Sequence, residues 1–257
     1  MLRDIRLRHL DFHATARPMA AMEVDYPSGT STGRHSHPRA QLLFAVSGVM
    51  IVRSPAGSWV VPSNRAVWLA AGLEHEVEMR GDVKIRTVFV DQDASPHLPR
   101  GNCVIAVSPL LRELIVAAVK VPVDYESGSR DACLMQLLLY QLRELDVLPL
   151  HLPMPDDTRL RTICEALLLS PDDDRTAGDW ADRFGVTSKT VHRLFLKETG
   201  LTFGQWRQQA RLLSALERLA RGDKIIDVAV DSGYASQSAF TAMFRRHFGT
   251  TPSAFYK

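Results

Sequence analysis

Residues 227–252 read DVAVDSGYASQSAFTAMFRRHFGTTP. The segment has the pattern of a helix-turn-helix, in which a small residue, Ala229, lies where two helices cross and Gly233 supplies the positive φ of the turn. Apolar residues on both sides are expected to lock the second helix onto the first: Val228, Tyr234, Ala239, Phe240, Met243 and Phe244. The segment therefore predicts two short helices packed across a tight turn.

The same pattern occurs earlier in the chain. Ala181 and Gly185 precede Ala229 and Gly233 by 48 residues. The apolar positions expected to lock this earlier motif are Trp180, Phe184, Val191, Leu194 and Phe195. A single match would be weak evidence, but two matches in register indicate a duplicated structural unit. Residues Thr202–Arg221 form a longer helical segment between the two motifs.

The charge of this part of the chain suits nucleic acid. Residues 183–257 contain 12 Lys or Arg against 5 Asp or Glu, a surplus that favours phosphate binding. In each motif the second helix is expected to enter the major groove with polar side chains facing outward. These are Ser188, Lys189, His192, Arg193 and Lys197 in the first motif and Ser236, Gln237, Ser238, Thr241, Arg245 and Arg246 in the second.

The two outward faces differ. The first is rich in donors suited to guanine edges and phosphates. The second is smaller and less basic until its C-terminal end, and Ala242 is short for a base-reading position. We therefore expect the first motif to read bases and the second to position the DNA backbone.

Residues 159–257 resemble the DNA-binding domain of the AraC family of bacterial transcription regulators. The resemblance rests on HRLFLKETG at 192–200, FGQWRQQARL at 203–212 and the segment at 227–252. It implies seven helices, with a long helix holding two recognition helices so that they enter successive major grooves on one face of double-stranded promoter DNA. It also implies recruitment or blocking of RNA polymerase.

The N-terminal part of the chain has a different residue pattern. Short β-branched or aromatic runs broken by turn residues predict a barrel or sandwich; they are Gln41–Val46, Val49–Arg53, Trp59–Val61 and Ile85–Val90. Trp59 and Trp68 are expected either to wall a pocket or, with more support, to pack in the core.

A group of histidines falls within this region. Residues two apart in a strand share a face, so His35 and His37 can chelate one ion. The spacing from Gly29 to Gly48 resembles the first motif of the cupin superfamily, with Gln41 where a Glu is usual, and His75 falls in a second such motif. The resemblance implies a cupin-like β-barrel with His35, His37, Gln41 and His75 in its site.

Three interpretations of this histidine site remain open. The side chains bind a divalent transition metal such as zinc, nickel, copper or iron, they form the polar lining of a site for an organic effector, or they are structurally satisfied histidines. The cofactor is therefore unknown at this stage.

Between barrel and DNA-binding region, Pro109–Lys120 and Arg130–Leu145 have helical periodicity. One stripe is broad enough either to pack on the barrel or to form the seam of a homodimer: Leu134, Leu137, Leu138, Gln141, Leu142 and Leu145. Leu148–Pro155, with three prolines, reads as a linker. The three cysteines have no CxxC spacing and are expected to be small buried residues: Cys103, Cys133 and Cys164.

The expected architecture is α+β. Residues 1–100 form a cupin-like effector domain, 101–155 linker helices, and 156–257 the DNA-binding domain with two helix-turn-helix motifs. Composition supports folded domains rather than disorder, since 46% of residues are hydrophobic and 23% are charged. The longest apolar runs, near 42–52 and 134–142, are shorter than the roughly 20 residues of a membrane helix, so we expect a cytoplasmic protein with no membrane partner.

The sequence thus predicts a DNA-binding transcription regulator whose barrel senses a small molecule or metal, with activation or repression left open. Two alternatives remain: a metal-dependent cupin enzyme, and a ligand-independent regulator whose barrel serves for dimerisation. No enzymatic activity is expected, because Glu74, Glu76 and Glu78 alternate as on an exposed strand and do not form a clear general-base site.

Overall fold

The computed structural model describes residues 12–63, 65–94, 97–142, 147–148, 150–248 and 250–255. The chain divides into two compact units. The first, called here the sheet unit, comprises Met1–Ser54 and Trp59–His151; the second, the helical unit, comprises Pro55–Ser58 and Leu152–Lys257. The predicted α+β class is confirmed, whereas the predicted three-way division at residues 100 and 155 stays a prediction.

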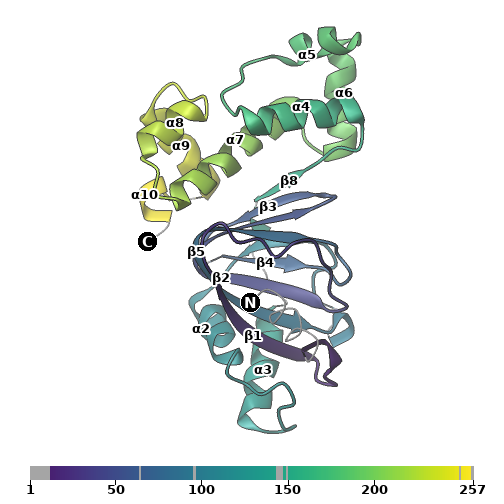
Figure 1. Cartoon of the computed structure of the whole chain (residues 1–257), viewed down its shortest axis with the longest axis vertical. Helices are drawn as coiled ribbons and strands as arrows, with labels where there is room; N and C mark the ends of the chain where they lie inside the picture. The colour runs from purple at the N-terminus through teal and green to yellow at the C-terminus, as the bar shows by residue number, and fades with distance from the viewer. Residues whose placement is uncertain are drawn as a thin grey trace. The chain divides into compact units, whose positions relative to one another are not determined.

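The sheet unit contains an antiparallel, barrel-like sheet (Figure 1). Its strands run in the order β1-β5-β2-β4-β6-β7, with β3 beside β2. The strands are β1 (Met19–Tyr26), β2 (Ala40–Ser54), β3 (Gly57–Val61), β4 (Arg65–Leu69), β5 (Glu76–Val90), β6 (Cys103–Ala106), β7 (Val147–Leu148) and, at the boundary between the units, β8 (His151–Pro153). A short 3-10 helix, η1 (Gln92–Ala94), follows β5.

The two longest strands, β2 and β5, pair along most of their length with register shifts at Ala45/Ser47 and Ser47/Val49. Gly48 lies at this irregularity with φ 76°. A Cβ atom there would stand 2.8 Å from the carbonyl oxygen of Asp82, so glycine is required at this point. The sequence predicted two strands, 41–46 and 49–53, where the structure has one strand that continues through a bulge.

Helices α2 (Pro109–Ala118) and α3 (Arg130–Gln141) cover one face of the sheet. Leu42, Phe44 and Trp68 from the sheet belong to one buried cluster with residues of both helices, including Ile115 and Leu138. Because side chains alternate along a strand, Gln41 faces the opposite side from Leu42. The sheet therefore has a helix-covered face and a second face that carries the histidines.

The predicted stripe on α3 is divided between core and surface. Leu138 and Leu142 are fully buried, whereas Leu137 is 43% exposed. Tyr140, which was not part of the predicted stripe, is also exposed, at 50%. Leu145 lies outside the described residues. Packing on the sheet thus accounts for part of the stripe, and a homodimer seam on the remainder stays a prediction.

Buried aromatic residues fill the sheet unit. Trp59 and Trp68 are 1% and 0% exposed, in agreement with core packing, and Trp59 stacks on His151 with ring centroids 4.6 Å apart. The expectation that all three cysteines are buried is confirmed only for Cys164, since Cys103 is partly buried and Cys133 is exposed on the solvent side of α3.

The described part of the helical unit contains seven helices. They are α4 (Thr158–Leu169), α5 (Ala177–Phe184), α6 (Ser188–Thr199), α7 (Phe203–Ala220), α8 (Ile225–Asp231), α9 (Gln237–Phe248) and α10 (Pro252–Phe255). The long helix α7 runs from the group α4–α6 to the group α8–α10 (Figure 1). Among the described residues, no helix combines the length and the apolar composition needed to cross a membrane.

Local signals in the sequence explain where several of these helices begin and end. Thr176 and Thr202 each form a capping box at the start of α5 and α7, which satisfies backbone N–H groups that the helix leaves free. Gly185 and Gly200 end α5 and α6 in the left-handed conformation.

Candidate DNA-binding surface and histidine site

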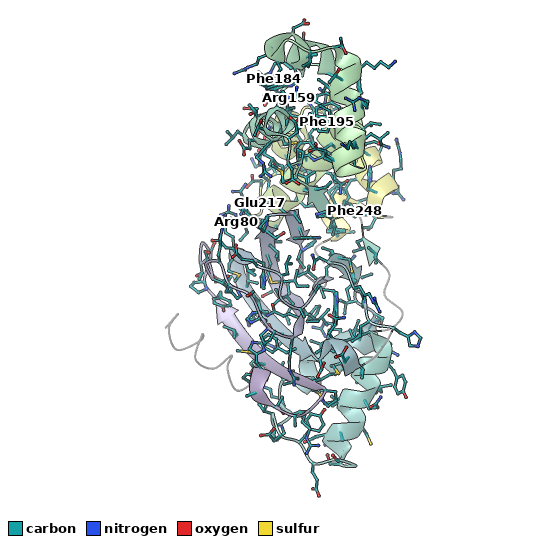
Figure 2. The ribbon with its side chains drawn as sticks, turned by 90° about the vertical axis from the view of Figure 1, so that its right-hand side faces the viewer. Arg80, Arg159, Phe184, Phe195, Glu217 and Phe248 are labelled. Atoms are coloured by element: carbon teal, nitrogen blue, oxygen red, sulfur yellow. The ribbon has the colours of Figure 1, made fainter. Side chains whose placement is uncertain are left out.

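The first helix-turn-helix motif is formed by α5 and α6. Gly185 ends α5 with φ 64°, and the N–H of Val186 donates to the carbonyl of Ala181 at 3.0 Å. Val191 and Phe195 on α6 are buried against the rest of the unit, while the predicted lock Leu194 is only partly buried. Phe184 and Phe195 are both labelled in this group of helices in Figure 2.

The outward side of α6 matches the sequence prediction. Lys189, His192, Arg193 and Lys197 are exposed, and Ser188 is partly exposed. Thr187 caps the helix by accepting a hydrogen bond from the N–H of Thr190 at 3.2 Å. The N-terminal part of α6 therefore presents cationic side chains and a helix terminus to solvent, an arrangement suited to DNA.

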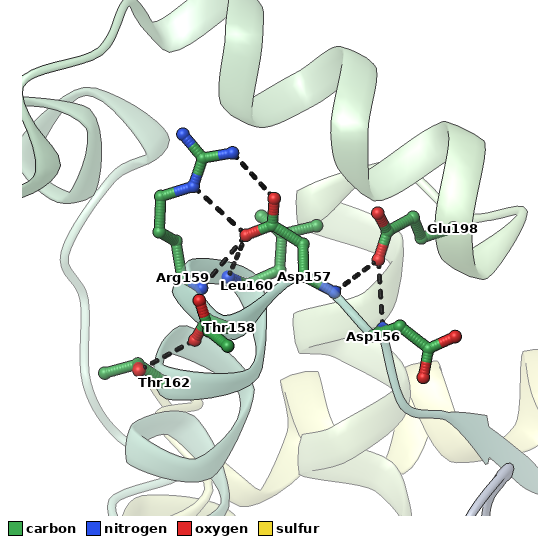
Figure 3. Close-up of polar contacts among 7 residues, drawn as sticks. All are labelled: Asp156, Asp157, Thr158, Arg159, Leu160, Thr162 and Glu198. Atoms are coloured by element: carbon green, nitrogen blue, oxygen red, sulfur yellow. Dashed lines mark hydrogen bonds and ion pairs between the residues drawn. The ribbon is translucent and has the colours of Figure 1, made fainter.

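A polar network fixes the C-terminal end of α6 (Figure 3). The carboxylate of Glu198 accepts hydrogen bonds from the backbone N–H groups of Asp156 and Asp157, at 3.0 and 2.8 Å. Asp157 in turn caps α4 and forms an ion pair with Arg159 at 2.6 Å; this hydrogen bond lowers the pKa of Asp157. The first recognition helix is thus tied to the start of α4, a connection the sequence did not reveal.

The second motif, formed by α8 and α9, repeats the turn geometry of the first. Gly233 has φ 73°, and the N–H of Tyr234 donates to the carbonyl of Ala229 at 3.0 Å. The buried lock residues are Val228, Phe240, Met243 and Phe244. Ala239 is exposed, so its predicted inward position is wrong: the buried stripe follows residues 240, 243 and 244, and 239 falls outside it.

The outward side of α9 is polar and weakly basic. Its exposed residues are Ser236, Gln237, Ser238, Ala242, Arg245 and Arg246, with Thr241 partly exposed. The hydroxyl of Ser236 accepts a hydrogen bond from the N–H of Ala239 at 3.1 Å and so occupies the place that Thr187 has in the first motif. The two arginines lie in the last turn of α9, where they also complement the helix dipole.

In the sheet unit, the structure brings the predicted histidines together. His35 and His75 form an isolated bridge in which each backbone N–H donates to the other residue's carbonyl, at 3.0 and 2.8 Å. His35, His37 and His75 each offer one ring nitrogen, and these three atoms lie within 4.8 Å of one another. His37, Gln41 and His75 are buried, at 7%, 3% and 2% exposure.

In His35 and His75, the ring nitrogen that makes no backbone hydrogen bond within the described residues, Nε2, is available to bind a ligand. Nδ1 of His35 is 2.8 Å from the carbonyl of Gly33, and Nδ1 of His75 is 2.9 Å from the carbonyl of Leu73. A proton on each Nδ1 leaves Nε2 as the electron-pair donor, the arrangement seen in metal-binding histidines. Nε2 of His75 and Oε1 of Gln41 are buried with no hydrogen-bond partner among the described residues.

Burial also sets the charge of this site. It lowers the pKa of His75 to about 4, against the smaller opposing effect of its hydrogen bond to Leu73. At neutral pH His75 is therefore uncharged, which is the form that binds metal.

A fourth histidine, which the sequence analysis missed, joins the group. Nε2 of His13 lies 2.9 Å from Nδ1 of His37, and its ring contacts Phe89 edge-on at 4.5 Å. The segment around it is held in place, since Arg39 donates to the carbonyls of Thr15 and Arg17. His13 belongs to no cupin motif, so no spacing in the sequence marked it.

The nearby glutamates are engaged elsewhere. Glu76 accepts a hydrogen bond from Ser31, and Glu78 forms ion pairs with Arg53 and Arg80 at 2.5 and 2.7 Å. Glu74 is exposed, with Arg34 3.9 Å away. These carboxylates follow the alternation of a strand face rather than converging on the histidines.

Comparison with known proteins identifies the helical unit. A family model described as a helix-turn-helix domain matches residues 180–257. The HTH-type transcriptional regulator NimR of Escherichia coli is 33% identical over 221 residues, which cover 86% of this chain and 81% of NimR. The HTH-type transcriptional regulator RipA of Corynebacterium glutamicum is 38% identical over 103 residues, 40% of this chain and 31% of RipA.

Among solved structures, ToxT from Vibrio cholerae aligns over 93% of this chain and 98% of its own, with 10% identity and a TM-score of 0.39. The relationship to NimR spans both units, and the duplicated motif has the turn geometry and apolar locks described above. The chain belongs to the AraC family of DNA-binding transcription regulators.

Proposed function

We propose that this regulator binds a divalent transition metal at His35, His37, His75 and Gln41, and that metal occupancy changes its binding to promoter DNA. The observation that carries the proposal is the convergence of three imidazoles within 4.8 Å together with a buried Nε2 of His75 that has no partner in the described part of the chain. An unpaired buried polar atom costs about 1–3 kcal/mol, and a metal would remove that cost.

The ligand chemistry narrows the choice of ion. Imidazole suits zinc, copper, nickel and iron, whereas carboxylate-rich sites suit magnesium and calcium. Gln41 offers a neutral amide oxygen, a weaker ligand than the glutamate usual in cupins, so its contribution is smaller than that of each histidine. The glutamates beside the site are paired with Ser31, Arg53 and Arg80, which supports sensing rather than catalysis.

Metal content tests this proposal directly. Protein purified without chelators is expected to contain close to one equivalent of a transition metal by elemental analysis, and His35→Ala is expected to lose it. DNA binding is then measured on the same preparations with metal removed and restored. Because an effector acts only through its different affinity for two states, equal DNA affinity with and without metal would reject the regulatory role.

A second candidate is an organic effector. A hollow of about 670 Å³ lies beside β1, with Phe12, Met22 and Val121 among its apolar walls and Arg86 among its charged ones. Its size falls in the range of small-molecule sites. Protein that carries no metal but shows a ligand-dependent change in DNA binding, abolished by Met22→Trp, would favour this alternative.

On DNA, we infer that α6 contacts bases through Lys189, His192, Arg193 and Lys197, with Ser188 at its N-terminus. Helix α9 contacts mainly the DNA backbone, through Gln237, Ser238, Thr241, Arg245 and Arg246. Ser236 also lies at this surface, although its hydroxyl already caps α9. The exposed Ala242 leaves the centre of α9 without a long base-reading side chain, which supports this division.

Other assignments extend the proposal to partners. We infer that the regulator acts on RNA polymerase at its promoters in the cytoplasm, without enzymatic activity, and that the exposed part of α3 forms a homodimer seam. Leu137 and Tyr140, one helical turn apart and both about half exposed, support the seam. Sedimentation analysis of Leu137→Glu against the wild type tests it, since an unchanged oligomeric state would exclude this surface.

A further inference from the structure

The two helix-turn-helix turns have the same backbone but different surroundings. Gly185 and Gly233 both have positive φ, 64° and 73°. No described residue lies within 4 Å of a Cβ atom placed on Gly185, whereas a Cβ on Gly233 would lie 2.8 Å from Nη2 and 2.9 Å from Cζ of Arg211. Only the second turn is thus in close contact with a guanidinium group from the long helix α7.

The Nε and Nη2 groups of the same guanidinium bind the chain segment that precedes the first motif. Nε of Arg211 donates to the carbonyl of Pro171 at 2.6 Å, and Nη2 donates to the carbonyl of Asp173 at 3.1 Å. These carbonyls belong to the segment that joins α4 to α5. The planar fork of arginine can satisfy two carbonyls at once, and burial of the group lowers the pKa of Arg211.

Further contacts connect Arg211 to the second helix of each motif, through the α4–α5 segment on one side and through the turn at Gly233 on the other. On the first side, Arg175 is bound to Asp173 and stacks on the ring of Trp180 in α5 at 4.0 Å, and α5 packs on α6. On the second side, Tyr234 follows Gly233 and contacts Phe240 of α9, with ring centroids 5.4 Å apart. One side chain therefore lies between the two halves of the DNA-binding surface.

We propose that Arg211 is a positioning residue that sets the placement of one recognition helix relative to the other, and thereby the spacing of the two DNA subsites that the regulator recognises. It touches no DNA itself. The first motif has no equivalent of Arg211. The residue 48 places earlier in the repeat is Ile163, an apolar residue that is fully buried. The inference rests on the proposed use of both motifs on one DNA duplex.

The physical effect follows from bivalency. When two binding elements are held at the correct separation, the second binds at high effective concentration, and the gain can reach about 10²- to 10⁴-fold. That gain disappears when the separation is wrong or variable, while the affinity of each element for its own subsite is unchanged. A residue that only stabilises the fold would instead lower binding to every DNA in the same proportion.

The experiment first selects DNA for the full-length wild-type protein from a random pool. It then measures affinity for the selected duplex, for duplexes with either subsite scrambled, and for duplexes with one base pair added or removed between subsites. Arg211→Ala and Arg211→Lys are expected to lose about tenfold or more on the two-subsite duplex, to lose little on single subsites, and to tolerate the altered spacings better than the wild type.

Two matched controls are available in the chain. Arg207 lies one turn before Arg211 and donates to the carbonyl of Arg175 at 3.1 Å, so Arg207→Ala also disturbs the segment before α5; we expect it to leave the spacing preference unchanged. Gly233→Ala and Gly185→Ala both place a side chain at positive φ, but only the former displaces Arg211. Gly233→Ala alone is expected to relax the spacing preference.

Thermal unfolding of each variant separates positioning from folding. If Arg211→Ala fails to fold, Arg211→Lys and Gly233→Ala still give the comparison. An equal proportional loss on all duplexes, or an unchanged spacing preference in these variants, would overturn the role of Arg211 while leaving DNA binding by both motifs intact. Selection of DNA with a single subsite by the wild type would instead overturn both.

Discussion

At the level of single side chains, the histidine site depends on which ring nitrogens are already engaged. Carbonyl groups hold Nδ1 of His35 and His75, whereas the corresponding neighbour of His37 is the ring of His13. A ligating histidine is oriented by the hydrogen bond of its other nitrogen. His13 is therefore expected to orient His37 without touching the metal.

Replacing His13 tests this role. His13→Ala is expected to weaken transition-metal affinity about 10- to 100-fold, the usual effect of removing such a partner. His13→Gln should recover part of the affinity, because its amide oxygen can accept a hydrogen bond from Nδ1 of His37. Competition against a chromophoric chelator measures the affinities, and equal values for wild type and His13→Ala would contradict the assignment.

Arg193 is the sharpest test of base reading by α6. Its guanidinium is exposed, and a bidentate contact to guanine is worth about 1–3 kcal/mol of discrimination. Arg193→Ala is expected to remove that discrimination at one base pair, measured on a panel of single-substitution duplexes. An unchanged pattern of preference would exclude base contact by this residue.

Arg245→Ala provides the contrasting control. A phosphate contact carries no sequence information, so this substitution should weaken binding to all duplexes alike. It should also reduce the slope of log affinity against log salt by about one. A wild-type slope would show that Arg245 makes no phosphate contact.

Where a spacing or motif in the sequence suggested a group of side chains, the structure places the histidines of that group close together, although their role stays a prediction. The prediction that His35 and His37 share the face of a strand is wrong, because the described segment between β1 and β2 contains isolated bridges at Ser31 and His35 rather than a strand. The structure nevertheless brings the two rings together with His75, which the family motif had added with Gln41. His13 could not be found because its contact to His37 depends on how a separate segment folds back on the sheet. Arg211 lies within a family motif, but its importance comes from two backbone carbonyls and a glycine that no sequence pattern connects.

At the level of helices and strands, the boundaries in the helical unit follow the capping signals closely. The predicted helix Thr202–Arg221 is α7, Phe203–Ala220, with its caps at the two predicted end residues. The sheet was harder to predict. Gly48 reads as a turn residue, and a glycine that permits a bulge cannot be distinguished by sequence from one that ends a strand.

The bulge gives a prediction at this scale. Gly48 and Gly81 have similar φ, 76° and 72°, so alanine at either is strained by about 1–2 kcal/mol. Only at Gly48 would the new methyl group also meet Asp82 and Val83, at 2.8 Å. Gly48→Ala is expected to lower the free energy of unfolding by about 1–3 kcal/mol more than Gly81→Ala, as measured by urea denaturation. Equal losses would mean that the strand shifts to make room.

For the molecule as a whole, the two units are expected to respond to acid over different pH ranges. In metal-free protein the pKa of His75 is about 4, below its ordinary value of 6.5. Between these values the unfolded chain binds a proton that the folded chain does not, so the free energy of unfolding rises with pH. This contribution is complete above about pH 6.5 and is lost as the pH falls toward 4.

The carboxylates of the helical unit affect stability at lower pH than His75 does. Hydrogen bonds from Arg159 and Arg175 lower the pKa of Asp157 and Asp173 below 3.8, so their contribution is present at pH 5 and is lost only as the pH falls below about 4.

Between pH 7 and pH 4.5 the sheet unit should therefore lose about 2 kcal/mol from His75. The helical unit should lose less, because its His247, whose pKa burial also lowers, is only partly buried. Hydrogen exchange of the metal-free protein, resolved by segment, measures both. The protection of β5 should fall more between the two pH values in the wild type than in His75→Gln. An equal change in both proteins would contradict the prediction.

The pairing of β1 with β5 has a consequence for how the chain acquires its structure. Residues 19–26 must find residues 83–90, whereas most of the packing in the other unit is between helices that follow one another along the chain. Closing long loops before any contact forms slows folding, and short-range contacts speed it. Refolding from denaturant should therefore show a fast phase from the DNA-binding helices and a slower phase from the sheet, so that a refolding chain recovers DNA binding before it recovers its histidine site.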